Sequence, residues 1–277
     1  METKTQTGGK SRRVGKKSRG VSAGIVILVC ACLASLFFYF VCADGKNFVN
    51  NDPNNHPLPG NFYGLIYKAG YVVIAIQTIL LTALVLSVER FFALTKAKGK
   101  GNLINFVYDV KANLRKNDIT AAEALCAKQK GAVAAIVDAG LKKYKEMSLS
   151  QSLTKEAKII EIKAEIEEAT ALELPGMQQN LPVIATISTL GTLLGLLGTV
   201  LGMIRAFSAM ATAGAPDSVA LSAGISEALI NTAFGIGTGA IAIITYSYFT
   251  GKIDNMTYAI DEMGFALTQT YAEAHDK

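Results

Sequence analysis

Four polar residues recur on one face of an apolar segment near the C-terminus, and the first of them is an acid. Asn231, Thr238 and Thr245 follow Glu227 at offsets of 4, 11 and 18 residues, which places all four on one stripe of an α-helix. An ionised carboxylate in hydrocarbon costs at least ~2.5 kcal/mol. An acid kept there, at the head of a polar stripe, indicates a functional role. The alternative is a carboxylate that snorkels from the segment end to the membrane interface.

A second apolar segment carries small residues at helical spacing. In lipid, such residues let two helix backbones approach closely. The pattern alone is more typical of helix packing than of a pore, because threonine can bond its own backbone. The small face consists of Ser188, Thr192, Gly195, Thr199, Gly202 and Ala206, and the small-xxx-small pairs are Gly191/Gly195, Gly198/Gly202 and Gly235/Gly239.

The composition indicates a membrane protein. Of 277 residues, 51% are apolar and 18% are charged, whereas soluble domains carry about 25% charged residues. These values exclude a disordered, collagen-like or disulfide-scaffold chain. Four uncharged stretches reach the length of about 20 residues that crosses a bilayer, at 21–43, 69–88, 174–204 and 228–251. We therefore expect an all-α polytopic membrane protein whose long transmembrane helices extend into the cytoplasm.

The distribution of Lys and Arg predicts the topology. The first nineteen residues hold seven Lys or Arg and the region 95–180 holds fourteen, whereas 44–62 holds only Lys46 and 214–218 holds none. By the positive-inside rule the basic regions are cytoplasmic. The expected order is a basic cytoplasmic tail (1–20), an extra transmembrane helix (21–43), a periplasmic loop (44–62), a transmembrane helix (63–95), a cytoplasmic helical region (96–180), a channel-lining helix (181–212), a periplasmic turn (213–218), a second channel-lining helix (219–252) and a cytoplasmic tail (253–277).

The first apolar segment has a second interpretation as a cleaved signal peptide ending at Val41-Cys42-Ala43. Its apolar core is longer than the usual 7–15 residues, which favours a retained helix. The basic residues before it are better explained as a flank that fixes topology than as a nucleic-acid or lipid-binding tail, since the apolar run follows at once. No nucleic-acid partner is expected.

The region 96–180 is predicted to consist of helical extensions rather than an enzyme domain. Helical patterns cover 103–114, 120–128 and 151–174, with a break at Asn117-Asp118, and the third could continue into the next span with no break before Pro175-Gly176. An enzyme needs a clustered nucleophile, base or metal set. The two histidines, His56 and His275, do not lie at ligand spacing with Cys or Asp, and no CxxC pair occurs. We expect no catalytic residues, metal or cofactor.

Two long motifs resemble a known family. Residues 195–207 read GLLGTVLGMIRAF and residues 224–235 read GISEALINTAFG. Both resemble the MotA/TolQ/ExbB proton channel family, and its ExbB members most closely. The stretches 89–94, 117–126 and 174–186 also resemble it, so that the likeness covers roughly 63–253. Two long motifs in the right order are far more specific than one short signature.

The resemblance implies a pentamer in the bacterial inner membrane. The last two spans of such proteins line a channel around the single-span helices of ExbD or TolR, which bring a membrane aspartate. Proton flow then drives movement that TonB or TolA carries to the outer membrane. By position, Thr199, Glu227 and Thr232 match the polar channel residues of the family. Asn231, Thr192 and Thr238 are the further candidates for the proton pathway.

Three functions stay open. An ExbB-type motor subunit that energises TonB-dependent transport is favoured. A TolQ-type subunit for envelope integrity and a non-conducting membrane scaffold are the alternatives. On an ideal helix Thr232 lies about 140° from Glu227, so both face one channel only if it is wide, the helix bends, or each turns inward in a different state. The sequence leaves open whether Arg205 pairs with a neighbour's Glu227 or with lipid phosphate.

Overall fold

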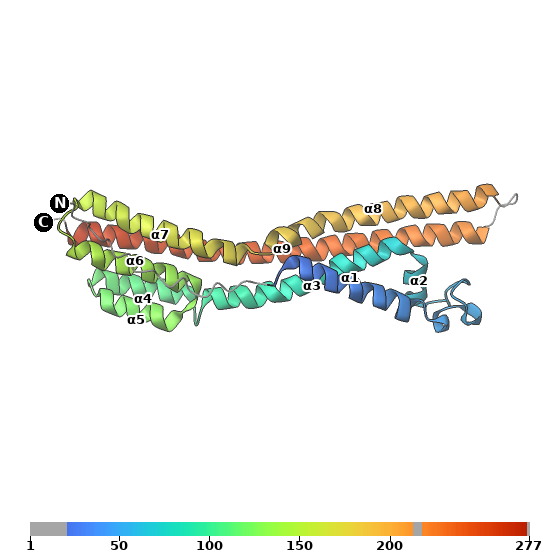
Figure 1. The fold of residues 1–277 in the computed structure, drawn as a ribbon, viewed down its shortest axis with the longest axis horizontal. Coiled ribbons are helices and arrows are strands. Elements are labelled where there is room, and N and C mark those ends of the chain that lie inside the picture. The colour runs from blue at the N-terminus through green and yellow to red at the C-terminus, as the bar shows by residue number, and fades with distance from the viewer. Residues whose placement is uncertain (1–20, 213–217, 276–277) are drawn as a thin grey trace, which may run out of the picture.

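The computed structural model describes residues 21–212 and 218–275. These ranges form an elongated bundle of helices without a named β-strand (Figure 1), which confirms the all-α prediction. The predictions for the N-terminal tail (1–20), for most of the turn at 213–218 and for the last two residues lie outside the described residues.

One half of the bundle is apolar and contains the N-terminal helices. α1 is prolonged by a π-helical turn, η1, and two short 3₁₀ turns, η2 and η3, precede α2 and α3. We call this part, together with α8 and the first half of α9, the apolar half. Its elements before α8 are α1 Ala23–Phe37, η1 Phe38–Cys42, η2 Gly45–Asn47, η3 Val49–Asn51, α2 Phe62–Lys68 and α3 Tyr71–Lys98.

The other half, which we call the polar half, contains four shorter helices and the C-terminal part of α9. The predicted break at Asn117-Asp118 is present, because Asp118 accepts a hydrogen bond from the Ala121 amide and begins α5. The third helix of this half, α6, has no counterpart among the sequence predictions. The helices are α4 Leu103–Arg115, α5 Ile119–Gln129, α6 Gly131–Leu149 and α7 Lys155–Gln178.

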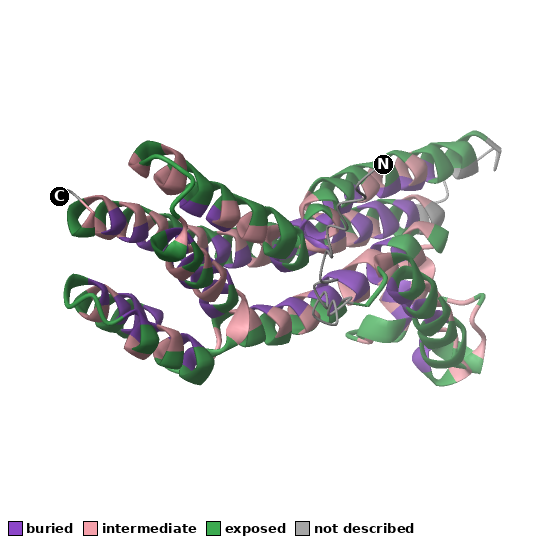
Figure 2. Ribbon diagram, turned by 60° about the vertical axis from the view of Figure 1, so that its left-hand side comes forward, coloured by how far each residue is buried: buried purple, intermediate pink, exposed green. Residues whose placement is uncertain are grey.

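Two long antiparallel helices pack together in the apolar half, and one of them, α9, continues into the polar half. α8 spans Leu181–Thr212 and α9 spans Ser218–Ala274, and the two lie side by side in Figures 1 and 2. α9 has 57 residues, so the expected separate C-terminal tail from 253 is instead helical to Ala274. Pro175 lies inside α7, and the chain breaks later, at Asn180, which has a left-handed φ of 64°.

The segment 63–95, which the sequence analysis expects to be a single transmembrane helix, is divided in the structure into α2 and α3. Ala69 ends the first helix and Gly70 has a φ of 77°, a conformation that glycine adopts without a Cβ penalty. The long apolar run hides this turn from a hydropathy argument. The turn directs the backbone of Gly70 toward α8 and α9.

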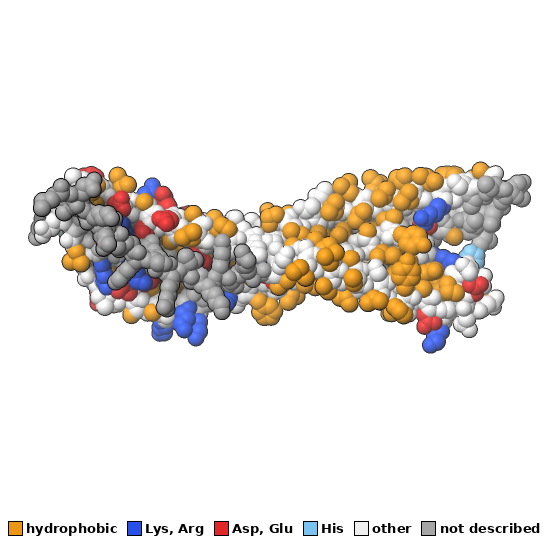
Figure 3. All heavy atoms as spheres, in the orientation of Figure 1, with side chains coloured by type: hydrophobic (Ala, Val, Ile, Leu, Met, Phe, Trp, Pro, Cys, Tyr) orange, Lys and Arg blue, Asp and Glu red, His pale blue; other side chains and the backbone are white. Residues whose placement is uncertain are grey.

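Four helices of the described residues are long and apolar enough to cross a membrane. Hydrophobic side chains cover the apolar half on the visible face, while charged side chains gather over the polar half at the left (Figure 3). Buried residues lie where helices face one another, and the outward sides are exposed (Figure 2). Since Leu28 and Phe40 of the first span are 69% and 75% exposed, this surface suits lipid. The chain is a multi-pass membrane protein.

A buried arginine joins the two halves. Arg90 is 1% exposed and donates to the carbonyl oxygens of Gly176 (3.2 Å) and Met177 (3.3 Å) near the end of α7. Its guanidinium also pairs with Glu89 at 2.5 Å, and Asn180 donates to the same carboxylate at 3.3 Å. The carbonyls at a helix C-terminus lack intrahelical partners, so Arg90 satisfies the end of α7 where it meets the apolar half.

Candidate functional site

An ion pair links α8 and α9 inside the apolar half. Arg205 Nη1 donates to Glu227 Oε1 of the same chain. Glu227 lies nine residues after Ser218, where α9 begins, or about 13 Å into the helix. The side chain of Glu227 is 10% exposed and that of Arg205 is 50% exposed. The partner of Arg205, which the sequence left open, is therefore its own chain's carboxylate in this structure.

The α2–α3 turn lies directly against this pair. A Cβ at Gly70 would stand 2.8 Å from Arg205 Nη1 and 2.9 Å from Glu227 Oε1. A side chain at position 70 would require the ends of Arg205 and Glu227 to shift, and the φ of 77° also favours glycine. The site thus contains backbone from α3 besides the two side chains from α8 and α9. The spacing of apolar residues around Gly70 in the sequence does not predict its contact with Arg205 and Glu227.

Asn231 stands one turn beyond Glu227 and joins the same three elements. It is fully buried, and its Nδ2 donates to the Ala69 carbonyl oxygen at 2.8 Å. Gly198 of α8 faces the Asn231 side chain, and a Cβ there would overlap it. The amide of Asn231 therefore fills the space between α8 and the α2–α3 turn.

Thr199 and Thr232 form a separate polar contact on another side of the α8–α9 interface. Their hydroxyl oxygens are in hydrogen-bond contact, and both lie 3.2 Å from the Gly195 carbonyl oxygen. Both residues are half-buried, whereas Asn231 is fully buried. Glu227 and Thr232 do not share a face of α9, in line with the angular separation on an ideal helix. The candidates therefore fall into two groups.

Glycines allow α8 and α9 to approach so closely. A Cβ at Gly191 would stand 2.9 Å from the Gly235 carbonyl oxygen, and one at Gly239 would stand 2.7 Å from the Ser188 carbonyl oxygen. By contrast, a Cβ at Gly237 would meet no other atom within 4 Å. The glycines with a neighbour on the facing helix within contact distance are Gly191, Gly195, Gly198, Gly202, Gly224, Gly235 and Gly239.

The remaining candidates have different surroundings. Thr238 is 1% exposed and lies on the same stripe as Glu227 and Asn231. Thr192 is exposed, and its hydroxyl faces Gly239. Sequence reasoning missed Gln77 of α3, which is 8% exposed inside the apolar half. A polar amide within an uncharged span was the signal that could have identified it.

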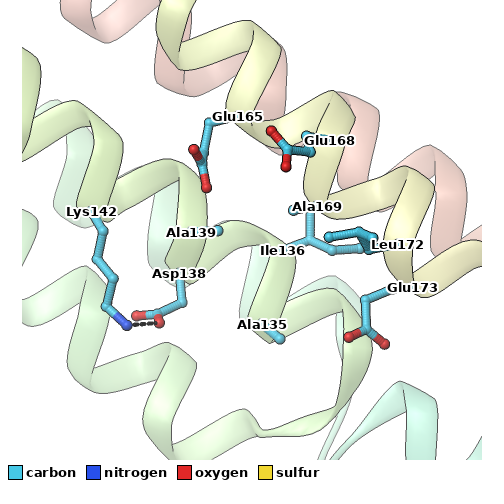
Figure 4. A pocket seen from close by; sticks show the side chains of 10 residues that line it. All are labelled: Ala135, Ile136, Asp138, Ala139, Lys142, Glu165, Glu168, Ala169, Leu172 and Glu173. Atoms are coloured by element: carbon cyan, nitrogen blue, oxygen red, sulfur yellow. Dashed lines mark hydrogen bonds and ion pairs between the residues drawn. The ribbon is translucent and has the colours of Figure 1, made fainter. Parts of the chain in front are cut away.

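Two hollows lie elsewhere, on the polar half. One of about 340 Å³ separates α6 from α7, and its wall includes Glu165, Glu168 and Glu173 of α7 (Figure 4). Asp138 on the opposite wall is already paired with Lys142 at 2.5 Å. The other hollow, of about 610 Å³, lies between α5 and α6 and is lined by Cys126. The described residues contain no group of three or more His, Cys, Asp or Glu placed to hold a metal ion.

Cys126 is a poor nucleophile in this setting. Burial, together with the carboxylates of Asp138 and Glu123, raises the pKa of its thiol to about 12. The thiolate is the reactive form of cysteine, and very little of it exists at neutral pH with such a pKa. Cys126 therefore faces the hollow between α5 and α6 as a protonated thiol, beside alanines and the charged residues Glu123, Lys130, Asp138 and Lys142.

Comparison with known proteins agrees with this arrangement. Residues 122–262 match the model of the MotA/TolQ/ExbB proton channel family, a range that includes α8 and the polar groups of α9. The chain is 30% identical over 119 residues to the biopolymer transport protein ExbB-like 3 of Synechocystis sp., which covers 42% of this chain and 57% of that protein.

Two further relatives point the same way. An ExbB homolog from Methanothermobacter thermautotrophicus is 34% identical over 95 residues, which is 34% of this chain and 33% of that protein. The Tol-Pal system protein TolQ of Haemophilus influenzae is 25% identical over 208 residues, which is 70% of this chain and 86% of that protein. The matched part thus spans 57% and 33% of the two ExbB-like relatives. With its paired helices, its buried carboxylate and the family match over half its length, the chain belongs to the MotA/TolQ/ExbB proton channel family.

Proposed function

We propose that this chain is the channel-forming subunit of a proton-driven motor of the ExbB type in the bacterial inner membrane. The observation that carries the proposal is Glu227, a nine-tenths-buried acid on an apolar helix, within a segment that matches the family. Ionisable groups inside membrane spans mark ion or proton pathways by default. In this function Glu227 takes up and releases a proton.

Arg205 sets the resting state of Glu227 in this proposal. A carboxylate that faces a guanidinium has its charge neutralised inside the bundle. Protonation of Glu227 removes the charge that holds Arg205, which donates to Oε1, and therefore weakens the ion pair. Movement of α8 relative to α9, or of the α2–α3 turn at Gly70, opens it. Proton uptake is thereby coupled to a change of shape.

Thr199 and Thr232 supply hydroxyls on the half-buried side of the same helix pair. A hydroxyl both donates and accepts, so this pair can hold water or bind a carboxylate brought by a partner. At rest the two hydroxyls satisfy one another and the Gly195 carbonyl. A partner helix that carries an aspartate replaces these contacts during a cycle.

The assembly follows from the family likeness. We propose a pentameric ring in which α8 and α9 line the channel, with an ExbD-type single-span partner inside and a TonB-type transducer beyond. The polar half is cytoplasmic by the positive-inside rule, and the loop that contains η2 and η3 is periplasmic. Cargo import across the outer membrane is the work that this assembly energises.

A TolQ-type role in envelope integrity is the second candidate. It is favoured by the Haemophilus influenzae TolQ match, which extends over 70% of the chain, whereas the two ExbB-like matches extend over 42% and 34%. Deletion of the gene separates the two roles. Loss of TonB-dependent uptake supports the ExbB type, whereas detergent sensitivity with normal uptake supports the TolQ type.

The test of the proton role is Glu227→Gln, with Glu168→Gln as a matched control on the exposed face of α7. We expect Glu227→Gln to abolish energised uptake, or envelope integrity in the TolQ case, while the membrane complex still assembles. Glu168→Gln leaves both unchanged. Normal energised function of Glu227→Gln would refute the proton role and leave a scaffold that only packs helices.

A further inference from the structure

Three buried polar atoms inside the apolar half have no hydrogen-bond partner among the described residues. They are Gln77 Oε1 on α3 and Asn231 Oδ1 and Thr238 Oγ1 on α9. The three residues are 8%, 0% and 1% exposed. A buried polar atom without a partner costs about 1–3 kcal/mol, so three such atoms at one interface require an explanation.

The orientation of two of these side chains is fixed by their neighbours. Asn231 donates through Nδ2 to the Ala69 carbonyl, so Oδ1 is the opposite end of the amide and points away from that bond. The Thr238 hydroxyl makes no bond to its own helix. By contrast, the hydroxyls of Thr82 and Thr245 bond the carbonyl four residues earlier, at 2.8 and 2.7 Å. Thr238 Oγ1 is thus available to a ligand.

The three groups lie at successive depths along one interface. α3 and α9 both run away from the contact between Gly70 and Glu227. At 1.5 Å per residue, Asn231 lies about 6 Å, Gln77 about 10 Å and Thr238 about 16 Å from that level. Gln77 on α3 therefore falls between the two α9 residues in depth.

α3 and α9 pack against one another, and Asn231 of α9 is bonded to Ala69, just before α3. Val73 of α3 and Phe234 of α9 belong to one small apolar cluster. Gln77 is one turn beyond Val73, and Thr238 is one turn beyond Phe234. The polar groups therefore occupy an interface that is otherwise apolar.

We propose that Gln77, Asn231 and Thr238 bind water inside the protomer, between α3 and α9. Asn231 and Thr238 lie about 10 Å apart in depth, so two waters rather than one are needed: one between Asn231 and Gln77 and one between Gln77 and Thr238. Each water then has at least two polar partners, as a buried water requires. The site begins one turn beyond the Arg205–Glu227 pair. It lies on the fully buried side of α9, apart from Thr199 and Thr232 on the half-buried side.

The site gives the proton on Glu227 a second route, a consequence that rests on the proposed function. Water held by Asn231, Gln77 and Thr238 continues the polar line from Glu227 toward the polar half, within one subunit. Gln77 then becomes a pathway residue on a helix outside the α8–α9 pair.

The test compares isosteric replacements in the full chain in lipid bilayers. Thr238→Val and Gln77→Leu remove a water ligand, and Thr82→Val is the matched control, since Thr82 is equally buried at 1% but bonds its own helix. Water-edited solid-state NMR measures magnetisation transfer from water to the Asn231 side-chain amide. We expect transfer in the wild type and in Thr82→Val, and at least a several-fold loss in the other two.

The outcomes separate the site from its role. No transfer to Asn231 in the wild type, or equal transfer in all variants, overturns the water site. If Gln77→Leu loses the magnetisation transfer but keeps normal energised function, the water site stands and the second proton route is refuted. Glu227→Gln alone decides the proposed function, because the water ligands do not include Glu227. Thermal unfolding checks that each variant remains folded, and we expect only a small shift for Thr238→Val, since valine keeps the shape of the side chain and removes one bond to water.

Discussion

The side-chain amide of Asn231 donates a 2.8 Å hydrogen bond to the carbonyl oxygen of Ala69, the residue that ends α2. A side chain of α9 thereby holds the backbone turn between α2 and α3. Because Gly70 in this turn also touches Arg205 and Glu227, displacement of the turn changes the surroundings of the buried acid. The loop before α2 is thus mechanically linked to the ion pair.

Replacement of Gly70 by alanine tests this link. The new Cβ would stand under 3 Å from Arg205 and Glu227, so we expect destabilisation beyond the cost of a left-handed alanine, by about 1–3 kcal/mol for overpacking. Gly60→Ala is the matched control, because Gly60 has a φ of 79° and a Cβ there would meet nothing within 4 Å. Unfolding in detergent measures both. Equal losses of stability in Gly70→Ala and Gly60→Ala would show that the turn does not contact the ion pair closely enough to affect stability.

The Arg205–Glu227 pair predicts strong non-additivity. Arg205→Gln leaves a nine-tenths-buried carboxylate without its partner, whereas Arg205→Gln combined with Glu227→Gln leaves no charge. We expect the double variant to be more stable than Arg205→Gln, with a coupling free energy of about 1–3 kcal/mol. A double-mutant cycle of unfolding free energies provides the measurement. Simple additivity of the two single effects contradicts the pairing.

Arg90 predicts a stability effect at the boundary between the halves. Arg90→Gln removes the donors to Gly176 and Met177 and leaves Glu89 without its ion-pair partner. Loss of one partner of a buried pair costs about 3–5 kcal/mol. Arg115→Gln, at an exposed position in the last turn of α4, is the control. A thermal melt that shifts equally for both variants would refute the capping role of Arg90.

Cys126 predicts resistance to alkylation and a defined pH dependence. With a thiol pKa of about 12 instead of 9.0, its thiolate fraction at pH 8 is roughly 1,000-fold lower than that of an ordinary cysteine. Maleimide should label an Ala112→Cys control on exposed α4 rapidly and Cys126 only after unfolding. The folded thiol keeps its proton to a higher pH than the unfolded thiol does. The free energy of unfolding is therefore unaffected by this group below pH 9 and falls as the pH rises from 9 toward 12. Rapid labelling of Cys126 in the folded chain contradicts the burial.

Periodicity predicted the helices that pack by small residues. The offsets of Gly195 and Gly202 on one face, and of Glu227 and Asn231 on another, follow from the regular geometry of a helix. The close approach of α8 to α9 could therefore be anticipated from sequence. The separation of Thr232 from Glu227 and Asn231 could also be predicted, since Thr232 lies about 140° from Glu227 on an ideal helix.

Contacts between distant segments could not be predicted in this way. The turn at Gly70 interrupts an apolar run without changing its hydropathy, and its reason is a contact with Arg205, 135 positions later. The partner of Arg205 depends on which face of α8 meets α9. Helix α6 carries apolar residues at helical spacing, among them Val133, Val137, Leu141 and Tyr144, so its pattern was present in the sequence and was overlooked.

The length of α9 has a mechanical consequence. It runs without a break or proline from Ser218 to Ala274, and Tyr271, buried against Tyr144 of α6, lies about 66 Å along the axis from Glu227. In the proposed motor, a tilt of this continuous helix beside the acid would displace its far end sideways, and the displacement would grow with the distance from Glu227.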